Sequence, residues 1–239
     1  MTDTCKCLLI GDGSVGKSSI IARFVNDGFQ KVYAQTIGVD FFEKKLDLRG
    51  DRGVMLQIWD IGGQSISSKN LPNYVRGADV VFMCYDVTNR DSFDDLEDWL
   101  QRVHEIYTDE TTGEKLRLPQ LYIIGNKIDL ISERQVTDAQ HDAWWRDHGI
   151  HGGFLGSAQT GENIATTIYK TAANSVGIQL TDYELGFHSR VINNVQGARG
   201  GDDDEGRTSC ADDIEAADRA MELAKQQRET SVGCKCSIC

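Results

Sequence analysis

The sequence predicts an α/β fold in which a mainly parallel, six-stranded sheet carries helices on both faces. Short apolar runs alternate along the chain with longer segments of helical periodicity, as in parallel α/β sheets. The first apolar run leads directly into the glycine-rich stretch GDGSVGKSS. The alternation ends near residue 180. We therefore expect one folded domain over residues 1–180 and a flexible, acidic, hypervariable tail over residues 181–239.

Six apolar runs are predicted as strands. Most are continuously apolar, which is typical of strands covered on both faces. The second run mixes charged and apolar residues and is predicted as an edge strand. The six runs are CKCLLI (5–10), FFEKKLDL (41–48), VMLQIW (54–59), ADVVFMCYDV (78–87), QLYIIG (120–125) and GFLGSA (153–158).

Helices are expected after Gly16, Thr88, Thr137 and Thr160, where apolar residues recur at helical spacing. A further short helix is predicted in the tail, over residues 211–229. The apolar faces of the second and fourth helices are predicted to contain Phe93, Leu96, Leu100, Val103, Tyr107, Ile164, Ile168 and Ala172.

Composition excludes several classes of protein. The formal net charge of −12 argues against a nucleic-acid binder, because phosphate contacts require clustered Lys and Arg. No run approaches the roughly 18 apolar residues of a membrane-spanning helix. The N-terminal stretch lacks a secretory pattern, so a cytoplasmic protein with reduced cysteines is expected.

The stretch that begins at Gly11 fits the pattern G-x-x-x-x-G-K-[ST], which binds phosphates between a strand and a helix. Its glycines let backbone N–H groups face the phosphates, and the helix N-terminus favours their negative charge. Lys17 is predicted to reach the β- and γ-phosphates, and the Ser18 hydroxyl to bind Mg²⁺. The predicted phosphate-binding residues are Gly13, Ser14, Val15, Gly16, Lys17, Ser18 and Ser19.

The stretch NKID (126–129) follows the fifth predicted strand and favours guanine as the base. The Asp129 carboxylate can accept hydrogen bonds from guanine N1–H and from its exocyclic amine, and adenine offers neither donor. Asn126 is expected to brace the loop, and the aliphatic part of Lys127 to lie over the base. The alternative is an ordinary solvated loop, since these residue types are common after strands.

The order of these motifs resembles a Ras-superfamily small GTPase over roughly residues 4–180. It comprises the phosphate loop, the threonine in QTIGVDF, then WDIGGQ, NKID and GSAQ. The resemblance implies the P-loop GTPase fold, GTP or GDP as bound nucleotide, Mg²⁺ as cofactor, and slow hydrolysis of GTP without an activating protein.

The resemblance also assigns individual roles to residues around the γ-phosphate. Thr36 is implied to join Ser18 on the metal and to contact the γ-phosphate, and Asp60 to hold the metal through water. Gly63 is implied to donate its N–H to the γ-phosphate, and Gln64 to orient the attacking water. The catalytic residues expected on this basis are Gln64, Lys17 and Thr36.

At the base, the resemblance places Phe29 against the guanine ring. Ser157 and Ala158 match the last base-contacting loop, and the Ala158 N–H is expected to make most of that contact. The third residue of this loop is Gln159, where the family usually has lysine, so weaker affinity at most is expected.

The sequence combines motifs that resemble two families, the Arf and the Rab proteins. WDIGGQ resembles the Arf proteins, but IGVDF (37–41) and YVRGAD (74–79) resemble Rab proteins, and Arf proteins do not end in cysteines. Phe41, Trp59 and Tyr74 match the aromatic triad through which Rab proteins contact effectors; ordinary core packing is the alternative.

The polar stretch SISSK after WDIGGQ, with GNKIDL and GIQLTDYELGFHSRV, resembles the divergent Rab-twenty-eight branch. Gly62 stands where most Rab proteins have alanine, and we interpret it as adding backbone freedom. SISSK also replaces the charged residues that usually anchor the second switch, so this switch is expected to be loose in the GDP state and distinctive to partners.

The resemblance implies a GTP/GDP-cycling switch that recruits effectors in its GTP state and regulates vesicle, endosomal or ciliary and flagellar traffic. Implied partners are an exchange factor, a GTPase-activating protein, effectors and a prenyl-binding chaperone that acts on the GDP form. The implied location is the cytoplasmic face of endosomal, Golgi or ciliary membranes. The alternative is a GTP-binding scaffold with little hydrolysis. An ATPase or nucleotide kinase is disfavoured by Asp129.

The last six residues, CKCSIC, predict lipid attachment. Residues 236–239 fit C-a-a-X loosely, which favours one prenyl group on Cys236. Cys234 and Cys236 also resemble the paired sites of doubly prenylated Rab proteins, and two lipids suit a tail without a basic patch. Zinc binding is disfavoured because no fourth ligand is evident. Unmodified thiols are the remaining alternative.

Overall fold

The computed structural model describes residues 2–26, 36, 38–48, 52–108, 115–181 and 183–186. All of them belong to the first of two compact units, Met1–Gly200, and the second unit, Gly201–Cys239, lies outside the described residues. The predicted tail boundary and the predicted helix over residues 211–229 therefore stay predictions.

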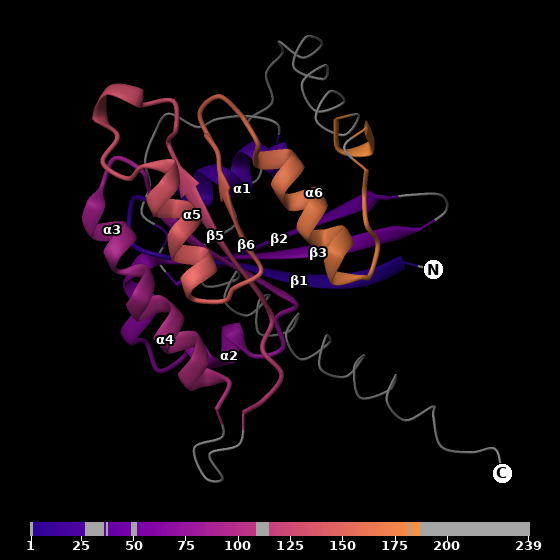
Figure 1. The fold of residues 1–239 in the computed structure, drawn as a ribbon. Coiled ribbons are helices and arrows are strands. Elements are labelled where there is room, and N and C mark those ends of the chain that lie inside the picture. Colours follow the sequence, from indigo (N-terminus) through magenta and orange to yellow (C-terminus); the bar gives the residue numbers. More distant parts are fainter. Residues whose placement is uncertain are drawn as a thin grey trace, which may run out of the picture. The chain divides into compact units, whose positions relative to one another are not determined.

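The centre of the fold is one six-stranded sheet with the order β2-β3-β1-β4-β5-β6 (Figure 1). Every neighbouring pair is parallel except β2 and β3. The mainly parallel six-stranded sheet is thereby confirmed, and the mixed second strand is an edge strand, as predicted. The strands are β1 (Thr2–Ile10), β2 (Val39–Asp47), β3 (Gly53–Ile61), β4 (Val80–Asp86), β5 (Gln120–Asn126) and β6 (Gly152–Leu155).

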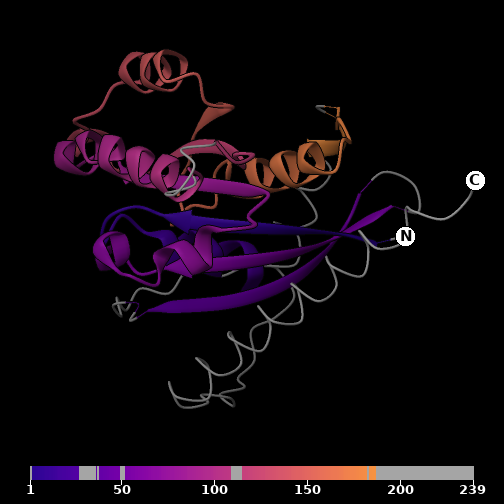
Figure 2. The same ribbon diagram turned by 90° about the horizontal axis from the view of Figure 1, so that it is seen from below.

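Helices connect the strands and lie on both sides of the sheet (Figures 1 and 2). Within the described ranges, none of them has the length and apolar character that crossing a bilayer requires. The helices are α1 (Lys17–Asn26), α2 (Leu71–Val75), α3 (Arg90–Asp94), α4 (Leu96–Ile106), α5 (Asp138–Asp147) and α6 (Ile164–Ser175), with short 3₁₀ turns η1 (Gly63–Ser67) and η2 (Ile131–Glu133).

Side chains on one face of the central strand β1 pack against α1 and α6. Cys5, Cys7 and Leu9 share one hydrophobic cluster with Phe24 of α1 and Ile168 of α6. Alternate residues of a strand point to opposite faces, so both faces of β1 are buried. On the other face, α3 and α4 contact β4. All eight residues predicted for the two apolar helix faces are buried.

Several elements differ from their predicted extents, and the two main differences lie in the helix after Thr88 and in the last strand. The helix expected after Thr88 is divided at Asp95, whose ψ of −9° departs from the helical value and separates α3 from α4. The last strand ends at Leu155, three residues earlier than predicted. Residues 157–161 form a turn instead, because Ser157 O accepts a hydrogen bond from Gly161 N at 2.8 Å.

His141 of α5 is a buried polar residue close to the sheet. Its Nδ1 lies 2.9 Å from the Tyr85 hydroxyl of β4, and only 1% of the residue is exposed. Burial lowers the pKa of His141 from 6.5 to about 4, although the nearby Asp142 carboxylate acts in the opposite direction. The imidazole is therefore neutral in the folded protein at neutral pH.

The depressed pKa of His141 predicts a loss of stability in acid. The unfolded chain takes up a proton near pH 6.5 and the folded chain only near pH 4, so stability falls as the pH is lowered through this window. At pH 5 the loss should be about 2 kcal/mol. Urea unfolding of the protein at pH 7 and pH 5 measures it. His141→Gln should flatten this dependence, and an unchanged slope in the variant would contradict the assignment.

Candidate functional site

The phosphate loop, residues 11–18, connects β1 to α1 at the carboxyl edge of the sheet. This edge is where ligands bind in open parallel α/β sheets. Gly16 has a φ of +98°, and a Cβ added there would lie 2.3 Å from Asn126 Nδ2. The glycine is thus required both by its backbone conformation and by the close approach of the loop after β5.

Lys17 is buried beneath this loop with 6% of its surface exposed. Its Nζ donates hydrogen bonds to the carbonyl oxygens of Gly11 at 2.7 Å and Asp12 at 2.6 Å. Burial lowers the pKa of Lys17, while negative charge nearby, including the Asp60 carboxylate, acts against the shift. An ammonium group held inside a ring of backbone groups is suited to a phosphate.

Three oxygen ligands converge beside Lys17 from three different segments. Ser18 Oγ lies 2.8 Å from Thr36 Oγ1 and also donates to Asp60 Oδ2, and Thr36 Oγ1 lies 3.3 Å from the same carboxylate oxygen. The other oxygen, Asp60 Oδ1, is buried without a hydrogen-bond partner among the described residues. Burial raises the pKa of Asp60, and the Ser18 hydrogen bond and Lys17 charge oppose the shift.

This donor set fits Mg²⁺. Hydroxyl and carboxylate oxygens are its preferred ligands, and it commonly takes only one or two protein groups together with waters and substrate phosphates. Asp60 is only 1% exposed, and its Oδ1 has no partner among the described residues. Burying such an oxygen is unfavourable in free energy unless a cation or a hydrogen-bond donor compensates it. No cluster of three or more His, Cys, Asp or Glu side chains suited to a metal occurs within the described ranges.

The segment after Asp60 brings the second switch against the first. Gly62 N donates a hydrogen bond to Gly38 O at 3.0 Å, and a Cβ added to Gly62 would lie 2.7 Å from Thr36 O. The φ of Gly62 is −55°, which any residue can adopt. In this conformation, glycine is required for close approach rather than for backbone freedom. The predicted looseness of the GDP state stays a prediction.

Gly63 and Gln64 begin η1 next to the phosphate loop. A Cβ added to Gly63 would lie 2.1 Å from Gly13 N, so the two backbones are in close contact. The Gln64 side chain is exposed. The structure therefore brings the predicted water-orienting residue to the same edge of the sheet as the phosphate loop.

The residues predicted to recognise guanine are joined by side-chain hydrogen bonds. Asn126 Nδ2 donates to Val15 O at 2.9 Å, and Asn126 Oδ1 accepts from Ala158 N at 3.0 Å. Ser157 Oγ donates to Asp129 Oδ1. The Ala158 N–H thus has a protein acceptor in this structure, and its expected contact with the base stays a prediction.

Asp86 and Trp99 lie beside the site and were not predicted from the sequence. Asp86, at the end of β4, accepts hydrogen bonds from Thr88 and pairs with Lys127 Nζ at 2.6 Å. Lys127 has a φ of +69°, which is a strained conformation for a residue other than glycine. The ion pair with Asp86 helps to hold the NKID loop in this conformation. The Asp-x-Thr spacing after the strand was an available signal.

Trp99 of α4 donates its Nε1 hydrogen to Asp12 Oδ1 at 2.9 Å and is 1% exposed. This hydrogen bond connects the phosphate loop to α4, and no local sequence pattern indicates a contact between residues so far apart in the chain.

The predicted aromatic triad also comes together. Phe41 and Trp59 have ring centroids 5.1 Å apart in an edge-to-face arrangement, and Trp59 and Tyr74 lie 6.3 Å apart. Lys6 Nζ lies 4.8 Å from the Trp59 ring centroid. Three elements, β2, β3 and α2, thus contribute to one aromatic cluster, in which Trp59 is buried and Phe41 and Tyr74 are partly exposed. Phe29, Cys234 and Cys236 lie outside the described residues.

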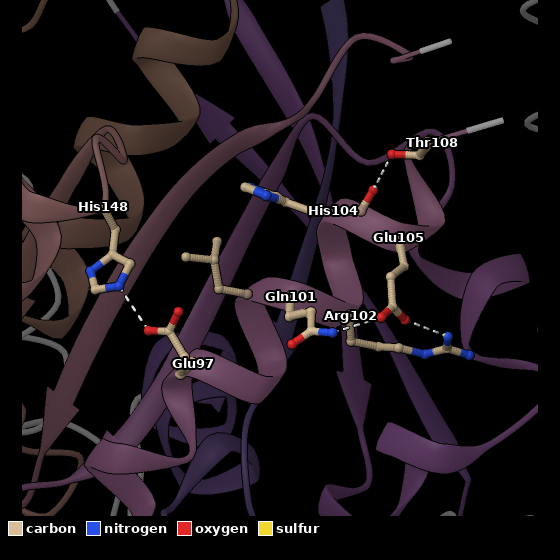
Figure 3. Close-up of a pocket in the computed structure, with 8 residues that line it drawn as sticks. Glu97, Gln101, Arg102, His104, Glu105, Thr108 and His148 are labelled. Carbon is tan, nitrogen blue, oxygen red and sulfur yellow. Dashed lines mark hydrogen bonds and ion pairs between the residues drawn. The ribbon is translucent and has the colours of Figure 1, made fainter. Parts of the chain in front are cut away.

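A groove of about 730 Å³ lies along α4 and shares no residue with the nucleotide site (Figure 3). Four of its polar side chains are already paired: His148 Nε2 lies 2.7 Å from Glu97 Oε2, and Arg102 Nη1 lies 3.0 Å from Glu105 Oε2. We assign it no part in the nucleotide chemistry. Its lining residues are Glu97, Leu100, Gln101, Arg102, His104, Glu105, Thr108 and His148.

A glycine-rich loop around a buried lysine, together with a converging Ser–Thr–Asp set, defines a P-loop nucleotide-binding protein. Comparison with known protein families identifies the kind of P-loop protein, because the Ras family model matches residues 6–176. The chain belongs to the Ras family of small GTPases, and its relatives place it among the Rab proteins.

Three relatives illustrate this placement. Ras-related protein Rab-28 of Caenorhabditis elegans is 35% identical over 187 residues, covering 78% of this chain and 73% of the relative. Ras-related protein Rab-13 of Mesocricetus auratus is 33% identical over 186 residues, covering 77% and 86%. Rab-13 of Bos taurus is 36% identical over 160 residues, covering 66% and 73%.

Family membership confirms the predicted class of activity. The protein binds GTP and GDP, hydrolyses GTP, and acts as a Rab-like switch in membrane traffic with regulators and effectors of the general Rab kind. The alternative of a scaffold with little hydrolysis is not favoured.

The close approach of Gly62 to Thr36 predicts the effect of replacing Gly62 with alanine. In Gly62→Ala the new methyl group would lie 2.7 Å from Thr36 O, so the backbone must shift. Such overpacking costs about 1–3 kcal/mol. We expect Thr36 to move away from Ser18 and Asp60, which lowers affinity for GTP relative to GDP by about fivefold or more.

Dissociation rates of fluorescent GTP and GDP analogues measure this ratio. Gly152→Ala is the matched control, because its added Cβ would approach the Tyr122 ring no closer than 3.6 Å. A Gly62→Ala protein with the wild-type ratio would show that the close approach has no role in nucleotide discrimination.

Proposed function

We propose that the converging residues of the phosphate loop and the two switches form a magnesium-dependent GTP hydrolysis site. In this proposal Ser18 and Thr36 would hold Mg²⁺ directly, and Asp60 would hold it through water. The observation that carries the proposal is the meeting of these three side chains beside the buried Lys17, with Asp60 Oδ1 left unpartnered among the described residues.

The chain's own residues act by position and charge. Lys17 and the backbone N–H groups of residues 13–19 hold the β- and γ-phosphates and neutralise charge that spreads over the γ-phosphoryl oxygens. Gly63 donates its N–H to the γ-phosphate, and Gln64 orients a water in line with the bond that breaks. Mg²⁺ held by Ser18, Thr36 and Asp60 would add positive charge there.

Base recognition is proposed for the connected loops at the end of β5 and β6. Asp129 accepts from guanine N1–H and the exocyclic amine, and Ser157 fixes the carboxylate through its hydroxyl. Lys127 lies over the base with its aliphatic part, and Phe29, outside the described residues, covers the other side. Ala158 and Gln159 complete the pocket near the base oxygen.

The partners follow from the proposed cycle. An exchange factor releases GDP, an activating protein accelerates hydrolysis, and effectors contact the aromatic cluster of Phe41, Trp59 and Tyr74 in the GTP state. A prenyl-binding chaperone carries the GDP form between membranes. The proposed location is the cytoplasmic face of endosomal, Golgi or ciliary membranes.

Single-turnover hydrolysis by the full chain with Mg²⁺ tests the proposed catalytic roles. The wild type should cleave GTP slowly, at about 10⁻⁴ s⁻¹ as in Ras-type proteins without an activating protein. Gln64→Leu should lose most of this cleavage and still bind GTP, because leucine cannot orient water. Gln101→Leu on α4 is a matched control outside the site. Equal rates in wild type and Gln64→Leu would refute the role of Gln64.

The lipid anchor is tested by the mass and membrane partition of the protein made in eukaryotic cells. We expect prenylation of Cys236, with Cys234 as the second site if two lipids are attached. Cys236→Ser should shift the protein from the membrane fraction to the supernatant, because stable anchoring is lost. An unmodified wild-type mass would rule out the anchor.

A further inference from the structure

The turn formed by residues 157–161 is held by α1 as well as by its own hydrogen bonds. Ser157 and Ala158 are buried, whereas the Gln159 side chain is exposed. Thr160 N donates to Ser157 Oγ at 3.0 Å and Gly161 N donates to Ser157 O at 2.8 Å. The second bond fixes the peptide plane that joins Ser157 to Ala158, but the carbonyls of Ala158 and Gln159 need a constraint from outside these bonds.

Arg23 of α1 supplies that constraint. Its Nε donates to Ala158 O at 2.8 Å, and its Nη2 donates to Gln159 O. A guanidinium presents its donors in one rigid plane, which suits two successive carbonyl oxygens better than a flexible ammonium. The side-chain stem lies close to the turn, since a Cβ added to Gly161 would be 3.5 Å from Arg23 Cδ.

Asn126 holds Ala158 from the side opposite to Arg23. Ala158 N donates to Asn126 Oδ1 at 3.0 Å, and Asn126 Nδ2 donates to Val15 O at 2.9 Å. Ala158 therefore lies between a cation that takes its carbonyl and an amide that takes its N–H. The carbonyl and the N–H of Ala158 belong to successive peptide planes, so Arg23 holds the plane after this residue and Asn126 holds the plane before it. Together they fix the backbone of Ala158 from both sides, with its N–H toward Asn126 and the phosphate loop, which is the side proposed to receive the base.

We propose that Arg23 is a positioning residue for recognition of the guanine C6 oxygen, through its hold on the carbonyls of Ala158 and Gln159. The inference rests on the proposed guanine site and deepens it. It also gives a physical reason why Gln159 can replace the lysine usual in the family motif. The cation that fixes this loop comes from α1, the helix that begins with Lys17 and Ser18.

Three nucleotides separate this role from a general loosening of the site. GDP carries the C6 oxygen and both donors for Asp129. 6-Thio-GDP keeps both donors and replaces the oxygen by sulfur, a weaker acceptor. IDP keeps the oxygen and lacks the exocyclic amine. The affinity ratio of GDP to 6-thio-GDP thus reports the contact at C6, and the ratio of GDP to IDP reports the contact with Asp129.

We expect the wild-type full chain to prefer GDP over 6-thio-GDP by about three- to tenfold, the value of one hydrogen bond. In Arg23→Gln, whose shorter neutral side chain cannot span both carbonyls, this ratio should fall below about twofold. The ratio of GDP to IDP should stay at its wild-type value. Arg146→Gln is the matched control, since Arg146 pairs with Asp142 on α5, away from this turn.

Each result decides the inference. The inference is overturned if Arg23→Gln keeps the wild-type ratio of GDP affinity to 6-thio-GDP affinity. It is also overturned if both affinity ratios fall equally, because an equal fall indicates a purely structural role. If Arg23→Gln fails to fold, Arg23→Lys carries the test: a reduced first ratio supports positioning by the guanidinium, and an unchanged one overturns it. Failure of the wild type to prefer GDP over IDP would instead overturn the proposed guanine site, and the inference with it.

Discussion

The side-chain amide of Asn126 connects the parts of the nucleotide site that lie on different strands. It donates to the phosphate loop at Val15 O and accepts from the turn after β6 at Ala158 N. Both bonds are buried, so breaking either would leave a polar group unpaired in the interior, which costs about 1–3 kcal/mol. Gly16 must lack a side chain because this amide occupies the space that a Cβ would need.

Buried charge gives the site its chemical character. Lys17, Asp60 and Asp86 are each at least nine-tenths buried, and each is compensated by hydrogen bonds or an opposite charge. Burying an ion is unfavourable unless partners replace the lost water. Lys17 satisfies two of its donors with backbone oxygens, and Asp60 satisfies one of its two oxygens with hydroxyl groups. Such groups are well placed to exchange these contacts for phosphate and metal.

The two glycines of WDIGGQ contribute through contact rather than through unusual backbone angles. Gly62 lies against the backbone of Thr36 and Gly38, and Gly63 lies against Gly13. Each position therefore joins the second switch to another loop of the site. This reading differs from the backbone freedom inferred from the sequence, because sequence alone does not reveal what occupies the space beside a glycine.

The sequence by itself determined the sheet, the edge position of β2, the buried helix faces and the local motifs at Lys17, Ser18 and Asp129. These features are encoded by periodicity and by residues close together in the chain, so a linear reading can find them. Only the tertiary structure revealed Arg23 on Ala158, Trp99 on Asp12 and the pair of Asp86 with Lys127. The first two contacts join residues 135 and 87 positions apart. Such contacts depend on how strands are ordered and helices packed, so a local signal such as Asp-x-Thr at Asp86 can indicate a turn but does not specify the distant partner.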